Sequence, residues 1–311
     1  MPLAPSRLSR PDLTLVPAAL APAQEDVEQQ ALMARWCPEG IDGARLVRST
    51  EGALQAEYQG LLLSSVFHPI FAARSGTARA VEGLLRARAI GTGQAVSPSI
   101  LFNRVTDKQD GIYLDRLCRF LHMHNFVRQA HAGLDLYLNL DARHLIAMRP
   151  GRYGEFFEEL LAACDLAPTR LIVEVTESQF DDRERLQRIT RAYAEKGYRV
   201  AIDDFGARNS NFDRLWALTP EIVKIDRELL IQAETNPRAF MVLPKLVDII
   251  HTLGAEVVCE GIETEDQHEL ALSTSVDFLQ GFHYRLPQAE LPCEQIKVTA
   301  LRAWTDAGRQ G

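Results

Sequence analysis

The sequence has few cysteines, and none of them lies in a spacing typical of a metal or redox motif. Its five cysteines are an odd number scattered over 311 residues, and no CxxC motif occurs. This pattern argues against a disulfide framework and against a cysteine-ligated zinc site, and it favours reduced thiols in a cytoplasmic protein. The sequence also lacks an apolar run long enough to cross a bilayer, so we expect no membrane span.

The sequence also has no excess of basic over acidic residues. The formal net charge is −8, whereas proteins that bind DNA or RNA polymers usually present a basic surface. We therefore expect no nucleic-acid polymer as a partner. A small anionic substrate stays possible, because metal ions can supply positive charge locally. No Ser-His-Asp or Cys-His arrangement for nucleophilic catalysis can be placed in the sequence.

The composition divides the chain into three parts. Residues 1–22 are rich in proline and alanine and predict a flexible tail; Pro17 interrupts the one apolar stretch that resembles a signal peptide. Residues 23–55 predict a short N-terminal helical segment, with a helix at Gln24–Trp36 that packs on the main domain or mediates assembly. Residues 56–305 predict one larger domain.

Within this larger domain, short β-branched runs alternate with longer amphipathic stretches. Such alternation predicts βα units and a mainly parallel sheet. Eight strand-like runs match a (β/α)8 TIM-type barrel, an α/β fold, in size. The first two runs are joined by a short turn around Ser75–Gly76, so we expect an irregular barrel with an antiparallel first strand. The runs are Leu61–Phe71, Ala78–Leu85, Leu134–Leu140, Arg170–Val175, Arg199–Ile202, Glu221–Ile225, Glu256–Cys259 and Asp277–Leu279.

Polar residues gather where these strands end. In a closed parallel barrel all the carboxyl ends of the strands meet on one face, which is where barrel enzymes keep their active sites. An Asp-Asp pair such as Asp203–Asp204 would, taken alone, commonly be a helix cap or part of a solvated loop. The recurrence at successive strand ends indicates a site instead. We expect these residues to come together: Glu82, Asn139, Glu174, Asp203, Asp204, Lys224, Glu260 and Gln280.

This set of residues indicates a chemistry. Several carboxylates in a partly buried mouth cannot all stay ionised unless cations compensate them. Oxygen ligands without cysteine or histidine favour Mg²⁺ or Mn²⁺. The adjacent Asp203 and Asp204 suit a pair of ions, which can clamp the oxygens of a phosphoryl displacement. Lys224 could orient water or neutralise charge developing on a phosphate. The residues alone therefore predict metal-assisted phosphoester hydrolysis.

Two histidines offer a weaker alternative metal site. His122 and His124 fall in a predicted helix, where a spacing of two residues places the side chains on different faces. We therefore expect a surface or partly packed role for both.

Seven sequence blocks follow one another in order between His68 and Pro287. The first block is Glu82-Gly83-Leu84, followed by Leu85 and Arg86. The others are LNLDARHL around Asn139, VEVTES from Val173, IDDFG from Ile202, VKID from Val223, CEGIET from Cys259 and LQGFHYRLP from Leu279. A single block would be weak evidence, but the ordered set is specific. Together these blocks resemble the EAL domain family of cyclic di-GMP phosphodiesterases.

The resemblance implies that the chain hydrolyses cyclic di-GMP to linear pGpG with two Mg²⁺ or Mn²⁺ ions. It implies that Glu82, Asn139, Glu174 and Asp203 hold the first ion, and that Asp203, Asp204 and Glu260 serve the second. Lys224 would position the attacking water, and Gln280 would order its surroundings. The resemblance also implies a homodimer. Further implied roles are contacts to the substrate by Leu84, Arg86, His68 and Asp226, and anchoring of the loop after Asp204 by Glu263.

The chain departs from the family pattern at four places, one of which is Thr106 where an acidic residue is expected. Gly83 replaces the usual alanine, a change that we expect to leave the site undisturbed, and His68 stands where glutamine is common. After Asp203–Asp204 the loop reads DDFGARNSNF, so Arg208 and Asn209 replace a glycine and an aromatic residue. The alternative function is therefore a catalytically silent receptor that binds cyclic di-GMP and signals through a regulatory protein partner.

Overall fold

The computed structural model describes most of the predicted main domain. The described residues are 24–129, 133–140, 155–164, 166–176, 183–207, 215–216 and 218–292. The predicted tail at 1–22 lies outside them, as do residues 293–305 of the predicted domain and the altered residues Arg208 and Asn209. Among the helices that are described, none is long and apolar enough to cross a membrane.

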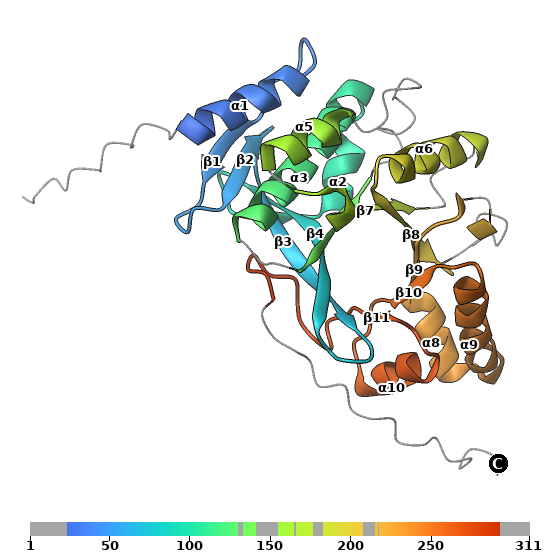
Figure 1. The fold of residues 1–311 in the computed structure, drawn as a ribbon. Helices are drawn as coiled ribbons and strands as arrows, with labels where there is room; N and C mark the ends of the chain where they lie inside the picture. Colours follow the sequence, from blue (N-terminus) through green and yellow to red (C-terminus); the bar gives the residue numbers. More distant parts are fainter. Residues whose placement is uncertain are drawn as a thin grey trace, which may run out of the picture.

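Eight described strands close into a barrel with helices around it (Figure 1). The ring runs β3-β11-β10-β9-β8-β7-β6-β4, and pairing of β3 with β4 closes it. The predicted α/β barrel is therefore confirmed. The strands are β3 (Leu61–Ala72), β4 (Ala78–Ala89), β6 (Asp135–Asn139), β7 (Leu171–Thr176), β8 (Arg199–Phe205), β9 (Ile222–Ile225), β10 (Glu256–Cys259) and β11 (Phe278–Leu279).

The irregularity also lies where the sequence predicts it. Strand β3 is antiparallel to both of its neighbours in the ring, β4 and β11, whereas the other neighbouring strands of the ring are parallel. Strands β3 and β4 form a long hairpin whose turn contains Gly76 at a φ of 67°. This φ is readily available to glycine, so the chain can reverse tightly here. A short strand, β5 (Ala95–Val96), extends the sheet from β4.

Helices cover the outside of the barrel. Asp107 caps the start of α3 (Lys108–Arg128), where its side chain accepts from two backbone N–H groups. Asp226 caps the start of α8 (Arg227–Thr235), where its side chain accepts from one. The long helix α3 packs against β3, β4 and β6. The described helices after β4 are α2 (Pro98–Arg104), α3 (Lys108–Arg128), α5 (Glu155–Cys164), α6 (Arg183–Glu195), α8 (Arg227–Thr235), α9 (Pro237–Thr252) and α10 (Glu265–Ser273), with a 3-10 turn at Pro168–Arg170.

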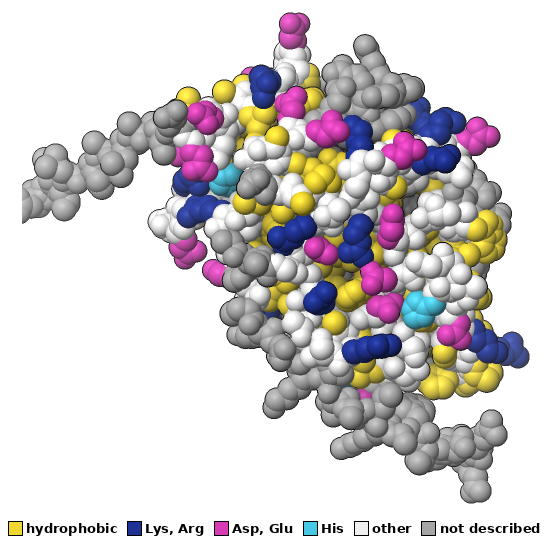
Figure 2. Space-filling model, in the orientation of Figure 1, with side chains coloured by type: hydrophobic (Ala, Val, Ile, Leu, Met, Phe, Trp, Pro, Cys, Tyr) yellow, Lys and Arg dark blue, Asp and Glu magenta, His cyan; other side chains and the backbone are white. Residues whose placement is uncertain are grey.

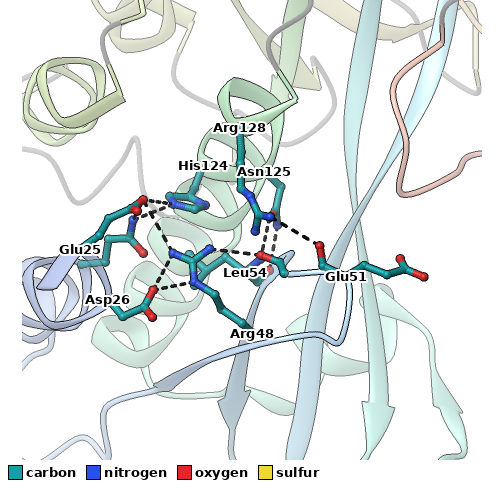
Figure 3. Close-up of polar contacts among 10 residues, drawn as sticks. Glu25, Asp26, Arg48, Glu51, Leu54, His124, Asn125 and Arg128 are labelled. Atoms are coloured by element: carbon teal, nitrogen blue, oxygen red, sulfur yellow. Dashed lines mark hydrogen bonds and ion pairs between the residues drawn. The ribbon is translucent and has the colours of Figure 1, made fainter. Parts of the chain in front are cut away.

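The N-terminal part packs against the barrel through strand β3 and helix α3. It consists of helix α1 (Gln24–Trp36) and strands β1 (Arg45–Arg48) and β2 (Leu54–Tyr58), and β2 pairs with β3. Arg48 donates to Asp26 at 2.6 Å, which ties β1 to α1 (Figure 3). The Asn125 side chain of α3 binds both backbone groups of Leu54, at 2.7 and 2.8 Å. The two strands in this part are not predicted by the sequence analysis.

The surface seen in Figure 2 carries interspersed acidic and basic side chains among its described residues. Inside the barrel, a separate apolar layer fills the space between the strands. It consists of Ile70, Ala80, Tyr137, Ile172, Ala201, Ile222 and Val258, with Phe278 packed against it.

Candidate active site

Each of the principal site residues lies two positions from a member of this apolar layer. Because side chains alternate along a strand, a residue two positions further along points to the same face. Lys224 follows Ile222 in this way, and Glu260 follows Val258. The apolar layer is thus the floor of the site. The same spacing places Glu82, Asn139, Glu174, Asp203 and Gln280 at its rim, and His68 two positions before Ile70 on the antiparallel strand.

Lys224 lies at the centre of the site. Its side chain is 1% exposed, and its Nζ is 2.6 Å from Glu174 Oε1 and 2.9 Å from Glu260 Oε2. The same Nζ is 3.1 Å from Asp203 Oδ1 and 3.5 Å from Glu82 Oε2. Burial alone would lower the pKa of Lys224, but the four surrounding carboxylates raise it well above its ordinary value. The ammonium is therefore charged at neutral pH and compensates one of these negative charges.

Glu82 is held by hydrogen bonds from two neighbouring amides. Gln280 donates to its Oε2 at 2.8 Å, and Asn139 donates to its Oε1 at 3.0 Å. Burial opposes ionisation of Glu82, yet Lys224 and these two donors hold its pKa below the ordinary value. Glu82 is therefore an ionised carboxylate with a defined orientation.

Asp203 and Asp204 come together through an irregularity in β8. Strict alternation would send their side chains to opposite faces. The pairing of β8 with β9 shifts register between Ile202 and Phe205, and Asp204 has a φ of 57°. Aspartate tolerates this left-handed conformation better than most residues do. As a result, carboxylate oxygens of Asp203, Asp204 and Glu260 all lie within 4.8 Å of one another.

The carboxylates outnumber the cations in this site. Burial and the charge of Glu82 raise the pKa of Glu174 well above its ordinary value, and burial together with Asp203 raises that of Glu260. Burial and the neighbouring Asp203 raise the pKa of Asp204 to about 6. A single ammonium cannot balance five carboxyl groups, so the site favours protons or further cations.

Divalent cations fit the donor set. Glu174 Oε2 and Gln280 Oε1 are buried, and neither has a hydrogen-bond partner among the described residues. A buried acceptor without a partner is costly, and a cation would satisfy it. All the candidate ligands are oxygens, the donors that Mg²⁺ and Mn²⁺ prefer. The predicted ligands Glu82, Asn139, Glu174, Asp203, Asp204 and Glu260 are therefore suited to hold such ions.

His68 joins the site from the antiparallel strand. It lies opposite Glu82 in the β3–β4 pairing, and its Nδ1 is 3.0 Å from Gln280 Nε2. Its ring also lies near the exposed ring of Phe282, with 5.6 Å between the centroids. Burial lowers the pKa of His68, against the attraction of Glu82. Phe282 lies within the block LQGFHYRLP, but the sequence analysis gave it no role, because its position at the rim depends on the loop after β11.

The other predicted substrate contacts are spread more widely. Leu84 and Arg86 alternate with buried residues on β4 and share the strand face of Glu82. Arg86 is exposed and, within the described part of the chain, donates to Leu85 O alone, at 3.0 Å, so its guanidinium has donors left for an anion. Asp226 is the cap of α8, where it accepts from Glu228 N at 2.8 Å.

Glu263 forms an ion pair at the edge of the site. Its carboxylate lies 2.5 Å from Arg227 Nη1 at the start of α8. The loop that Glu263 is predicted to anchor continues into residues 208–214, which lie outside the described residues. Its anchoring role therefore stays a prediction.

One expectation about neighbouring residues is wrong. His122 and His124 lie on different faces of α3 as predicted, but both are buried, at 5% and 8% exposure. Gly83 is closely packed: a Cβ placed on it would lie 3.0 Å from His122 Cβ and Cγ. An alanine there would require its neighbours to give way by a few tenths of an ångström. Sequence periodicity could not reveal this contact, because it depends on how closely α3 approaches β4.

Comparison with known proteins identifies the family. The EAL domain family profile matches residues 51–287. The chain belongs to the EAL domain family. Among curated relatives, the probable cyclic di-GMP phosphodiesterase PdeG of Escherichia coli is 28% identical over 233 residues, which are 71% of this chain and 44% of PdeG. This EAL chain matches less than half the length of each of four curated relatives, PdeG among them.

Solved structures agree with the fold. The PaMucR phosphodiesterase in complex with c-di-GMP has a TM-score of 0.65 and 25% identity, covering 73% of this chain and 92% of PaMucR. Bacillus subtilis YkuI, with an EAL domain in complex with c-di-GMP and calcium, has a TM-score of 0.65 and 26% identity. That match covers 75% of this chain and 57% of YkuI.

Proposed function

We propose that this EAL chain is a phosphodiesterase that hydrolyses cyclic di-GMP to pGpG with two divalent cations, Mg²⁺ or Mn²⁺. The observation that carries the proposal is the surplus of carboxylates around Lys224, together with the unpartnered Glu174 Oε2. Burying so many charged groups costs folding free energy, so stability alone does not account for this site. It suits a function that brings cations to a phosphate.

The cations, when bound, would neutralise phosphate charge and polarise the phosphoryl oxygens. Glu82, Asn139, Glu174 and Asp203 would hold the first ion, and Asp203, Asp204 and Glu260 would serve the second. Gln280 keeps Glu82 oriented through its 2.8 Å hydrogen bond. Lys224 has the charge and the central position to orient the attacking water and to stabilise negative charge in the transition state. Hydrolysis adds this water across one of the two phosphodiester bonds of the ring.

Substrate contacts follow from the strand face that carries Glu82. Arg86 would bind a phosphate, because its exposed guanidinium can donate in a bidentate manner. Leu84 would contact a guanine. His68 and Asp226 would line the remainder of the substrate site, His68 from the strand opposite Glu82. We also propose that the chain acts as a homodimer, with Glu263 anchoring the loop after Asp204. The four described cysteines are free thiols, which supports a cytoplasmic location.

The test is conversion of cyclic di-GMP, followed by chromatography of the nucleotides. Glu82→Gln removes the charge of a ligand at nearly constant shape, and Glu256→Gln is its matched control. Glu256 lies at the opposite end of β10 from Glu260, where it pairs with Arg199. We expect wild type and Glu256→Gln to form pGpG at similar rates and Glu82→Gln to form almost none. Equal rates in all three proteins would refute the proposed site.

A receptor that binds cyclic di-GMP without cleaving it is the second candidate. The replacement of a family glycine and an aromatic residue by Arg208 and Asn209 favours it. This candidate predicts tight binding of cyclic di-GMP with no product after prolonged incubation in Mn²⁺. A calorimetric titration on the same sample separates it from an inactive protein that does not bind, and signalling would then require a regulatory protein partner.

A further inference from the structure

Gly83 lies so close to His122 and Leu138 that any side chain at this position would contact both. It lies on β4 next to Glu82 and faces away from the site, toward helix α3. A Cβ on Gly83 would lie 3.0 Å from two atoms of His122 and 3.2 Å from Leu138 Cδ2. These distances are tighter than ordinary carbon–carbon contacts of about 3.5–4.0 Å. The lack of a side chain at residue 83 therefore makes room for the His122 ring.

The His122 ring is fixed in place. Its Nδ1 lies 2.8 Å from Ser65 Oγ on β3, and Ser65 also accepts from Asn125 at 3.4 Å. The Asn125 side chain in turn bonds to the backbone N–H and C=O of Leu54 (Figure 3). Burial lowers the pKa of His122 to about 3, so the ring stays neutral. Because these bonds hold the ring, added bulk at Gly83 would displace β4 rather than His122.

Displacement of β4 would reach the site by two routes. Glu82 is the adjacent residue, and its carboxylate depends on hydrogen bonds of 2.8 and 3.0 Å. Gly83 is also paired with Leu138 on β6, and the next residue, Asn139, donates one of these bonds. A shift at residue 83 would thus move both Glu82 and its donor.

We propose that His122 is a positioning residue for Glu82, and that the fit between Gly83 and His122 sets the geometry of the metal ligands. The inference rests on the proposed metal-dependent function. The ring of His122 supports β4 from outside the barrel and touches neither substrate nor cation. The sizes of the side chains at residues 83 and 122 are matched. Changing one of them disturbs the metal ligands, whereas enlarging residue 83 and shrinking residue 122 together compensate.

The test is a double-mutant cycle with Gly83→Ala, His122→Ala and the combined variant. Gly91→Ala is the matched control, since a Cβ at this glycine meets nothing within 4 Å. Three readouts are taken: Mn²⁺ affinity without nucleotide by calorimetry, kcat and KM for cyclic di-GMP, and thermal stability. Measuring Mn²⁺ affinity without substrate keeps the test independent of turnover.

We expect Gly83→Ala to weaken Mn²⁺ binding and to lower kcat, each by about tenfold, with little change in KM. His122→Ala should also weaken Mn²⁺ binding, because β4 loses its support. The combined variant should return to within about threefold of wild type, since the new methyl group occupies part of the space left by the ring. Gly91→Ala should match wild type throughout.

Two results would overturn the inference. One is Gly83→Ala with wild-type Mn²⁺ affinity. The other is a combined variant whose Mn²⁺ affinity falls by the product of the two single effects, which would mean independent sites.

Loss of thermal stability with unchanged Mn²⁺ affinity would indicate a purely structural contact and also counts against the inference. If Gly83→Ala does not fold, His122→Ala and the combined variant decide by the same comparison. A wild-type chain that binds Mn²⁺ without turnover refutes the proposed hydrolysis only, whereas one that binds no Mn²⁺ overturns both.

Discussion

Lys224 Nζ and Glu174 Oε1 lie 2.6 Å apart, and each residue follows an apolar residue of the barrel interior by two positions. The two strands that carry them, β9 and β7, are separated by β8 in the ring. The contact therefore reaches across β8 at the mouth of the barrel. Three further carboxyl groups lie within reach of the same ammonium, which makes the site rich in negative charge.

Replacing Lys224 by methionine should separate its two roles. Without the ammonium the carboxylates repel one another, so we expect the free energy of unfolding in chelator to fall by about 3 kcal/mol. The site also becomes more negative, so Mn²⁺ should bind more tightly than in wild type while hydrolysis falls at least about 100-fold. Calorimetry, thermal melts and product analysis measure these three effects.

Lys245→Met, on the exposed side of α9, is the control and should resemble wild type. Weaker Mn²⁺ binding in Lys224→Met would mean that the lysine organises the ligands instead of competing with the cation.

Glu174→Gln should change how stability depends on pH. Burial and Glu82 raise the pKa of Glu174 well above 4.5, so above this pH the folded chain binds more protons than the unfolded chain. The free energy of unfolding then falls as pH rises. In chelator we expect Glu174→Gln to equal wild type at low pH and to exceed it by at least about 1 kcal/mol at pH 8.

Thermal or urea unfolding across the pH range measures this difference, and Mn²⁺ should remove it by stabilising wild type. Parallel stability curves for wild type and Glu174→Gln would contradict the electrostatic description of the site.

Asp204→Asn tests the second cation. Asparagine tolerates the left-handed conformation at φ 57°, so the variant should keep wild-type stability in chelator. It loses the charged carboxylate that faces Asp203 and Glu260. We expect calorimetry to give one tightly bound Mn²⁺ per chain where wild type binds two, with little hydrolysis remaining. Two tightly bound ions in Asp204→Asn would assign the second ion to other ligands.

Much of this site could be predicted from the sequence because the barrel repeats a simple rule. A strand with an apolar interior and a polar residue at its carboxyl end recurs around the ring, so Glu82, Glu174, Lys224 and Glu260 could be placed together without coordinates. The predicted strand runs agree with the observed ones closely; β10, for example, is Glu256–Cys259 in both.

What could not be predicted depends on contacts distant in sequence or on single backbone angles. The residue types at Asp203-Asp204 do not indicate that the backbone of Asp204 is in the left-handed conformation, although this conformation brings both carboxylates to Glu260. Helix α8 begins directly after β9 and is only nine residues long, so the sequence offers only a short stretch of helical periodicity from which to predict it. Strands β1 and β2 precede the βα rhythm, and they are stabilised by pairing with β3 and by contacts with α3.

Arg86→Ala should mainly affect substrate binding. The exposed guanidinium is placed to bind a phosphate, and loss of such a charge-assisted contact should raise KM about tenfold while kcat changes little. Arg79→Ala, at the opposite end of β4, is the control. Steady-state kinetics over a range of cyclic di-GMP concentrations measure both constants. An unchanged KM in Arg86→Ala would place the phosphate elsewhere.

The central claim is that the carboxylates around Lys224 bring divalent cations to a cyclic dinucleotide and that the chain then hydrolyses it. The most direct measurement is the rate at which the wild-type chain converts cyclic di-GMP after all metal has been removed, and again after Mn²⁺ is restored. The account predicts no conversion in chelator and accumulation of pGpG once Mn²⁺ returns. Cyclic di-GMP that stays intact in saturating Mn²⁺, or pGpG that forms equally fast in chelator, would contradict it.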